Sequence, residues 1–443
     1  MTAIVWFRRD LRLADNRALA AACAAGKVVP LFILDDDTPD AFAIGGAQRW
    51  WLHHSLTALS KSLGGKLLLR RGKAADVVRV VAAEVGASEV HANRLYEPWE
   101  AASEVALDDL VTFHDSDAIV PPERIATAAG TPFKVYGAFW RGLAEQLPPE
   151  EPGDAPAAID LASLPMGDDL ASWKLLPTHP DWATGLGREW TPGEAGAAER
   201  LTDFAAEVAH YAVRRDLPSE EGTSRLSPHL HLGEVSPRQV WHALSGHGAK
   251  FLKELAWRDF GRSAIRAQPD LGSVNGRAGM NALPWRTGQA ADANFAAWTR
   301  GRTGYPIVDA GMRQLWATGW MHNRVRMITA SFLVKHLLID WRRGERWFWD
   351  TLVDADYGNN SLNWQWIAGT GTASQPFFRI MAPLVQSEKF AAADYIRLWV
   401  PELAHLSDAA IHDPADDDRG AYPLKLIGHR EARERTLAAF KAG

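Results

Sequence analysis

The chain has 443 residues, of which 47% are hydrophobic and 23% charged, and its formal net charge is −6. This length exceeds what one hydrophobic core usually serves, so we expect two domains. The single cysteine, Cys23, excludes a disulfide framework and a thiolate metal site. No apolar run is long enough to span a bilayer, and the N-terminus indicates a strand and a charged loop, not a secretory signal. We therefore expect a soluble protein of the cytosol.

Charge is distributed unevenly along the chain. Residues 1–199 contain 18 Lys and Arg against 28 Asp and Glu, a net charge of −10. Residues 200–400 contain 24 against 18, a net charge of +6. This asymmetry indicates an anionic partner for the second half, although a solvated basic face gives the same pattern. Of the 20 tryptophans, 12 lie beyond residue 200.

Short apolar segments alternate with amphipathic ones over the first 120 residues. Strand patterns occur at 3–7, 28–34, 66–72, 88–94 and 112–119, with helical patterns at 16–26, 45–65 and 74–87. The alternation predicts a Rossmann-like parallel sheet with helices on both faces. No G-x-G-x-x-G follows the first strand, so the usual dinucleotide-binding fingerprint is absent.

The alternation ends in a segment rich in Pro, Gly and Ala at residues 148–198, which is typical of a connector. Strand patterns then disappear. Helical spacing follows at 199–216, 236–246, 249–267, 307–319, 320–344 and 344–355. We therefore predict an α/β domain at 1–130, a linker at 131–198 and an all-α domain at 199–443.

Two motifs of the helical half are ambiguous by themselves. "GTSRLSPH", residues 222–229, offers backbone N–H groups, hydroxyls and a cation to a phosphate, but equally suits a helix capped by Ser224 or Ser227. On a helix, Asn323 and Met327 share a face beside Arg326. That face suits a pocket for a flat heteroaromatic ring, or a core position next to a surface arginine.

A third motif, "DADYGNNSLNWQW" at 354–366, combines carboxylates, amides and tryptophans. Asp354 and Asp356 resemble a D-x-D pair for a divalent metal, which would indicate a nucleotide transferase. No third carboxylate or Walker lysine supports that interpretation, and the pairs of histidines lack metal-ligand spacing. The carboxylates could equally pair with an arginine or accept from a ring N–H or a ribose hydroxyl.

Taken together and in order, the motifs resemble one family. They are "VWFRRDLRLADN", "EGTSRLSPHL", "ELAWRDF", "TGYPIVDAGMRQL", "GWMHNRVRMITASFLVKHLLIDW", "DADYGNNSLNWQW" and "FFRI". The chain is similar to the photolyase/cryptochrome family from residue 4 to about residue 400, and most similar to bacterial photolyases for cyclobutane pyrimidine dimers in DNA. The resemblance implies an α/β antenna domain, a long linker and a helical domain that holds FAD.

The resemblance also implies roles toward the flavin. Asn360 would face flavin N5 and favour the fully reduced anionic ring, whereas plant-type photoreceptors place an acid there. Asp354 and Asp356 would flank the isoalloxazine and adenine ends, with Arg326 paired to Asp354. The residues implied in FAD binding are Tyr211, Thr223, Ser224, Arg225, Leu226, Ser227, Arg258, Asn323, Arg326, Asp354, Asp356 and Asn360.

Electron transfer and the substrate follow from the same resemblance. Trp364, Trp341 and Trp285 match the family's electron-transfer chain; large aromatics that fill a helical core are the plainer interpretation of each one alone. A flipped-out dimer would be contacted by Glu254, Trp257, Asn323, Met327 and Trp366, with Glu254 also stabilising its radical anion. Phosphate contacts are implied for Arg215, Arg324, Arg379 and Lys389.

The antenna is the least defined part. Glu100 aligns with a pterin-binding glutamate of relatives that hold methenyltetrahydrofolate, but Trp99 replaces the neighbouring asparagine of that pattern. We favour folate, with a deazaflavin or no antenna as alternatives.

The sequence thus predicts a light-driven lyase that repairs cyclobutane pyrimidine dimers in DNA as a monomer in the bacterial cytosol. A cryptochrome-like photoreceptor without repair activity is the second hypothesis. Asn360, Trp257, Met327 and the absence of a long signalling tail argue against it. The third hypothesis, a metal-dependent nucleotide transferase, would lack a visible chromophore.

Overall fold

The computed structural model describes residues 1–35, 38–372 and 380–442. The chain forms two compact units. The first contains residues 1–209, 224–270 and 354–358, and the second contains residues 210–223, 271–353 and 359–443. Among the described residues, no helix has the length and apolar character needed to cross a membrane.

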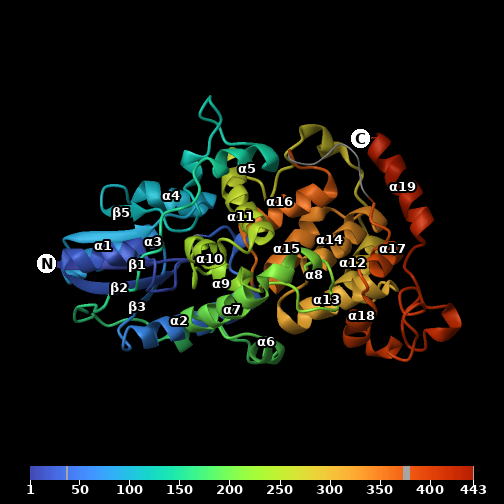
Figure 1. Ribbon diagram of the computed structural model, residues 1–443, viewed down its shortest axis with the longest axis horizontal. Helices are drawn as coiled ribbons and strands as arrows, with labels where there is room; N and C mark the ends of the chain where they lie inside the picture. Colours follow the sequence, from blue (N-terminus) through green and yellow to red (C-terminus); the bar gives the residue numbers. More distant parts are fainter. Residues whose placement is uncertain (36–37, 373–379, 443) are drawn as a thin grey trace. The chain divides into compact units, whose positions relative to one another are not determined.

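The first unit is built on a five-stranded parallel sheet (Figure 1) with the order β3-β2-β1-β4-β5. The strands are β1 (Thr2–Phe7), β2 (Lys27–Leu34), β3 (Leu68–Arg71), β4 (Glu89–Asn93) and β5 (Val111–His114). The central strand β1 pairs with both β2 and β4, so Ile4 lies opposite Val29 on one side and Val90 on the other. The predicted parallel sheet is confirmed.

Helices cover both faces of this sheet. Ile4 and Trp6 of β1 share a buried apolar cluster with Val78 and Val81 of α3 (Ala74–Val85). Alternate strand residues point to the opposite face, where α1 (Arg17–Ala25) packs against β1 and β4. The remaining helices between the strands are α2 (Gly46–Ser62) and α4 (Pro98–Ala106).

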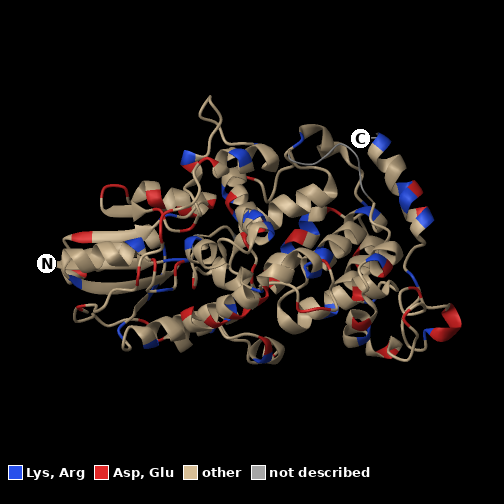
Figure 2. Ribbon diagram, viewed as in Figure 1, with Lys and Arg blue, Asp and Glu red and all other residues tan. Residues whose placement is uncertain are grey.

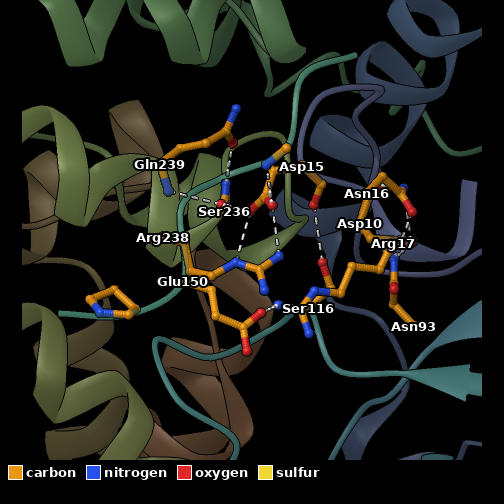
Figure 3. Close-up of polar contacts among 12 residues, drawn as sticks. Asp10, Asp15, Asn16, Arg17, Asn93, Ser116, Glu150, Ser236, Arg238 and Gln239 are labelled. Atoms are coloured by element: carbon orange, nitrogen blue, oxygen red, sulfur yellow. Dashed lines mark hydrogen bonds and ion pairs between the residues drawn. The ribbon is translucent and has the colours of Figure 1, made fainter. Parts of the chain in front are cut away.

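A buried polar network joins the segment after β1 to α10 (Pro237–Leu244), as Figure 3 shows. Asp15 accepts hydrogen bonds from Ser236 Oγ at 2.5 Å, from Arg238 Nη2 at 2.7 Å and from Arg238 Nε at 3.1 Å. Its neighbour Asn16 accepts from Asn93 Nδ2 at 2.8 Å. These contacts explain why residues 224–270 belong to the same compact unit as the sheet. The predicted domain limits divide the chain into consecutive segments, whereas the two compact units each combine several segments. The predicted limits are therefore not tested and stay predictions.

The remaining α-helices are distributed over both units. In the first unit these are α5 (Tyr136–Ala144), α6 (Thr184–Glu189), α7 (Glu194–Glu207), α9 (Ser227–His231) and α11 (Ala249–Ala267). The second unit contains α8 (Tyr211–Arg214), α12 (Gln289–Thr299), α13 (Pro306–Thr318), α14 (Asn323–Ser331), α15 (Trp341–Thr351), α17 (Pro383–Lys389), α18 (Ala393–Trp399), α19 (His429–Ala442) and most of α16 (Tyr357–Ala368). No strand occurs in the described part of the chain beyond His114, which confirms the predicted helical second half.

The single helix predicted at residues 320–344 is wrong. After α14 the chain forms a π-helical turn over Phe332–His336, and Leu338 then adopts a positive φ of 52°. A new helix, α15, begins at Trp341, where the Asp340 side chain accepts from Arg342 N at 3.0 Å. The helical spacing of apolar residues continues through the break. The prediction followed that spacing and overlooked Asp340 as the N-cap of a new helix.

Candidate functional site

The amide of Asn360 on α16 is held by Glu345 on α15. Asn360 Nδ2 donates to the Glu345 carbonyl oxygen at 3.1 Å and to Glu345 Oε1 at 3.0 Å. Ser361 Oγ donates to the same Oε1 at 3.2 Å. Because a backbone carbonyl accepts only, the NH2 end of the amide must face Glu345. The amide oxygen of Asn360 is thereby turned away from Glu345 as an acceptor.

Glu345 is itself fully buried. Burial raises the pKa of its carboxyl group to about 7; the hydrogen bond from Ser361, the charge of Arg346 and the hydrogen bond from Asn360 only partly offset that effect. Its Oε2 has no hydrogen-bond partner among the described residues. Sequence reasoning missed Glu345. The available signal was an acid placed i+4 from Trp341, on the buried face of α15.

This arrangement fits an isoalloxazine ring. An acceptor oxygen fixed in orientation suits the N–H of a reduced flavin, and the amide has no proton that it readily gives up. The carboxyl behind it is uncharged below a pH of about 7, so it places little negative charge near such a ring. The donor set supports Asn360 as the residue that would face the flavin.

The tryptophans of the second unit differ in their surroundings. Trp364 is buried, and a Cβ at Gly344 would lie 2.2 Å from its ring, so only glycine lets α15 and α16 approach this closely. Trp341 is buried, and its Nε1 donates to Asn275 Oδ1 at 2.9 Å. Trp285 is half-buried in the loop before α12. The electron route through the three indoles stays a prediction.

A ladder of buried charges runs through the first unit. Asp117 accepts from Arg262 Nε at 2.9 Å and also pairs with Arg258, and Arg262 Nη1 donates to Asp356 Oδ2 at 2.6 Å. Burial opposes the charge of Asp356, but Arg262 outweighs it and holds the pKa of this carboxyl far below its usual range. Asp354 is also buried. Asp117 and Arg262 were not predicted, because their pairing joins segments far apart in the sequence.

The motif at 222–229 does not form the expected serine cap. Leu226 precedes α9 without a side-chain cap, and Ser224 Oγ accepts from Leu226 N at 3.3 Å within the loop. Arg225 has a positive φ of 53°, pairs with Glu189 and places its cation 5.0 Å from the centre of the Trp190 ring. Capping by Ser224 or Ser227 is therefore wrong. Leu226 and Arg225 lie in the first unit, while Tyr211 and Thr223 fall in the second.

The predicted lesion contacts divide between the units. Glu254 and Trp257 lie on α11, where Glu254 pairs with Lys250 at 3.1 Å and Trp257 is partly exposed. In the second unit, α14 begins at Asn323 and carries Met327 one turn later, as the spacing predicts. Trp366 on α16 is 39% exposed.

Three predicted phosphate contacts gather around Phe390 and Asp216 in the second unit. Arg324 Nη2 lies 2.8 Å from Asp216 Oδ1, and its guanidinium lies 4.4 Å from the Phe390 ring centre. Arg215 Nε lies 3.8 Å from the same carboxylate oxygen, and Lys389 lies 5.3 Å from the Phe390 ring. Asp216 and Phe390 thus hold three cations in one cluster.

Two further arginines with predicted roles, Arg326 and Arg379, do not belong to this cluster as described. Arg326 Nε donates to the Met321 carbonyl at 2.7 Å, and its predicted pairing with Asp354 stays a prediction. Arg379 lies outside the described residues. Lys and Arg alternate with acidic residues over the helices (Figure 2), so the basic excess of residues 200–400 is not confined to one element.

The expected antenna residues are engaged within the first unit. Glu100 pairs with the buried Arg8 at 2.6 Å. Trp99 stacks on Phe42 at 5.7 Å and meets the Tyr357 ring edge-on at 5.1 Å. A separate open cleft of about 560 Å³ lies beside Trp50 and Trp190, and its lining also includes His54, Lys61 and Asp181.

His229 and His231 are buried, where His229 contacts Glu234 and His231 contacts Gln48. Within the described ranges, no cluster of three or more His, Cys, Asp or Glu side chains could hold a metal ion.

Comparisons with known proteins agree with this geometry. A family model described as the FAD binding domain of DNA photolyase matches residues 251–442, and one described as DNA photolyase matches residues 3–157. The deoxyribodipyrimidine photo-lyase of Agrobacterium fabrum is 48% identical over 99% of this chain and 97% of its own length. Cryptochrome-1 of Arabidopsis thaliana is 37% identical over 99% of this chain and 70% of its own length.

Solved structures give the same result. A bacterial class III photolyase from Agrobacterium tumefaciens superimposes with a TM-score of 0.94 at 46% identity, covering 100% of this chain and 97% of that one. Both the sequence matches and the structural match span nearly the whole chain. The protein therefore belongs to the DNA photolyase family, whose α/β domain and helical FAD-binding domain it carries.

Proposed function

We propose that the protein is a light-driven lyase that splits cyclobutane pyrimidine dimers in DNA. The observation that carries the proposal is the amide of Asn360, held by Glu345 so that its oxygen is presented as an acceptor. The chemistry that bound, reduced FAD would supply under blue light is the reversible transfer of one electron to the dimer, which allows its C5–C5 and C6–C6 bonds to break. The dimer gains no electron overall, and the products are two intact pyrimidines.

The chain's residues would hold and orient the reacting groups. In the first unit, Glu254 would hydrogen-bond a base edge of the dimer and stabilise the charge that develops on it, and Trp257 would stack on a base. In the second unit, Asn323 would hydrogen-bond the bases, Met327 would pack against them and Trp366 would supply a second aromatic face. Trp341, Trp364 and Trp285 would restore the reduced flavin by passing electrons inward.

DNA binding would depend on the cluster of Arg215, Arg324 and Lys389. Lys and Arg contacts to phosphates release counterions, so affinity falls steeply as salt rises. Phosphate contacts fix the position of a protein on the duplex but do not recognise the lesion. The cluster would therefore act on damaged and undamaged DNA alike. We place this activity in a monomer in the cytosol.

The experiment uses purified protein, reduced flavin and an oligonucleotide that carries one cyclobutane thymine dimer. Blue light is expected to restore two thymines, with no change in the dark. A (6-4) photoproduct in the same sequence is the matched control. It is expected to stay intact, because the family resemblance implies histidines in enzymes for that lesion at the positions where this chain has Asn323 and Met327. A dimer that survives illumination in the presence of bound, reduced FAD would refute the proposal and favour a photoreceptor role.

We further propose a folate antenna in the first unit. Two locations are open to it: the neighbourhood of Glu100, and the cleft beside Trp50 and Trp190, whose indoles could contact a flat pterin. The holoprotein is expected to show an absorption band besides those of FAD. Loss of that band in Glu100→Ala would support the first location, and loss in Trp50→Ala would support the second. A spectrum of FAD alone, in protein purified with folate present, would refute the antenna.

A further inference from the structure

Tyr136, at the start of α5, stacks face to face on Trp257 of α11. The two ring centres are 3.7 Å apart, and the ring planes differ by 6°. Aromatic pairs in proteins more often adopt offset or edge-to-face arrangements, so a parallel pair at this distance is a specific geometry. One face of the Trp257 indole is thereby covered by Tyr136. Both residues lie in the first unit.

Further contacts hold this pair in place. The Phe260 ring lies edge-to-face with both partners, with its centre 5.6 Å from the Trp257 ring centre and 5.8 Å from that of Tyr136. The Phe260 ring centre also lies 5.4 Å from that of the buried Phe139. The Tyr136 hydroxyl donates to the carbonyl of Lys253, one helical turn before Trp257. Burial raises the pKa of Tyr136 above its ordinary value, so the hydroxyl remains a donor at all physiological pH values. The tyrosine is therefore fixed to the same helix turn as the indole that it supports.

We infer that Tyr136 is a positioning residue that orients Trp257 for the flipped-out lesion. The inference rests on the proposed function, in which Trp257 stacks on a base of the dimer. With one indole face covered and its edge contacted by Phe260, the side chain is ordered before DNA arrives. An ordered side chain loses less conformational entropy on binding, which strengthens the complex without any new contact to the ligand. The segment that carries Tyr136 was predicted as part of a linker.

The role differs from plain core packing in a measurable way. Only a nucleotide that has left the duplex reaches Trp257, whereas undamaged DNA is bound through its phosphates. Loss of Tyr136 is therefore expected to weaken binding of dimer-containing DNA without changing the affinity for undamaged DNA. A purely structural residue would change both affinities, or the melting temperature, together.

The experiment compares dissociation constants of the FAD-bound protein for a dimer-containing duplex and an undamaged duplex in the dark. The variants are Tyr136→Ala, Tyr136→Phe and Trp140→Ala. Trp140 is the matched control, because it lies on the same helix and contacts Lys253 by a cation–π interaction rather than stacking on Trp257. Each variant is also combined with Trp257→Ala, and flavin content and melting temperature are recorded.

Tyr136→Ala is expected to weaken dimer binding roughly 2- to 10-fold, the range for one side chain that must become ordered on binding. Tyr136→Phe keeps the stack and is expected to bind like the wild type, as is Trp140→Ala. In the Trp257→Ala background the Tyr136→Ala effect is expected to vanish. If Tyr136→Ala unfolds, Tyr136→Leu takes its place in the same cycle.

The inference would be overturned if the Tyr136→Ala protein bound dimer-containing DNA as tightly as the wild type does. It would also be overturned if Tyr136→Ala weakened that binding equally with and without the Trp257 indole. In both cases the proposed function stands. A wild-type protein that does not distinguish dimer-containing from undamaged DNA would refute the proposed function itself, and the inference with it.

Discussion

Two buried carboxyl groups that lie close in the sequence have pKa values shifted in opposite directions. Glu345, in the second unit, contacts neutral donors, and burial raises its pKa to about 7. Asp356, in the first unit, is as well shielded from water, but Arg262 lies 2.6 Å away and keeps its pKa far below the usual range. Burial alone does not decide whether an acid is charged; the presence of a cationic partner does.

The difference extends to the surroundings of each group. Around Asn360 the structure uses neutral hydrogen bonds and aromatic packing, with Trp364 closely fitted against Gly344. Around Asp356 it uses a ladder of arginines and aspartates that crosses from α11 to Asp117. A neutral setting suits the place where a flavin would accept and return electrons, since a fixed charge there would bias the redox potential.

The largest effect on stability is expected from breaking the ladder. Asp356→Asn leaves Arg262 buried with one fewer carboxylate, which should cost about 3–5 kcal/mol of unfolding free energy. Urea denaturation followed by circular dichroism measures it. Asp394→Asn is the control, because that carboxylate is 81% exposed in its pair with Arg397 and should contribute less than about 1 kcal/mol. Equal effects of the two variants would contradict the comparison.

A smaller effect, which depends on pH, is expected from Glu345→Gln. The folded-state pKa lies above the ordinary value, so the folded protein binds the proton more tightly and loses stability as pH rises through the window from about 4.5 to about 7. At pH 8 the variant should be more stable than the wild type by about 3 kcal/mol, whereas at pH 4 the two should be equal. Unfolding curves at both pH values test the sign, and a variant less stable at pH 8 would show that Glu345 is charged and satisfied.

Trp341→Phe is expected to lower the free energy of unfolding by about 1–2 kcal/mol, because the variant loses the hydrogen bond to Asn275 and part of a fully buried side chain. Its functional effect is expected to be larger. Photoreduction of bound FAD by an external donor should be blocked, while chemically reduced protein should still repair dimers. Trp298→Phe is the control, since Trp298 is buried in the same unit but is not assigned to the electron route. Survival of both activities in Trp341→Phe would refute the assigned route.

The smallest effect on stability is expected from Glu254→Ala, because the Glu254–Lys250 pair is partly exposed and should contribute no more than about 0.5 kcal/mol. Repair should slow while FAD stays bound. Lys250→Ala removes the same ion pair and should leave the rate of dimer repair unchanged. A similar rate in both variants would assign Glu254 to the surface rather than to the lesion.

The sequence was sufficient for the parts of the molecule that depend on local pattern. Alternating strands and helices predicted the parallel sheet, because strand and helix periodicities differ and a parallel sheet needs crossover helices. The motif at 354–366 also predicted that Asn360 would face the flavin, which stays a prediction. The helix break at Leu338 was missed, because a single positive φ leaves the spacing of apolar residues unchanged on both sides of it.

What the sequence by itself determined was therefore the family and the fold class, and it proposed the residue types that would face the flavin and the DNA. Only the tertiary structure decided which of those residues have partners, and hence their charge and orientation. Glu345 behind Asn360, Arg262 beside Asp356 and Tyr136 on Trp257 each join segments that no local pattern relates. Electrostatic and stacking interactions act over a few ångströms in space, and the number of residues between two positions in the sequence does not tell how close they are in the fold.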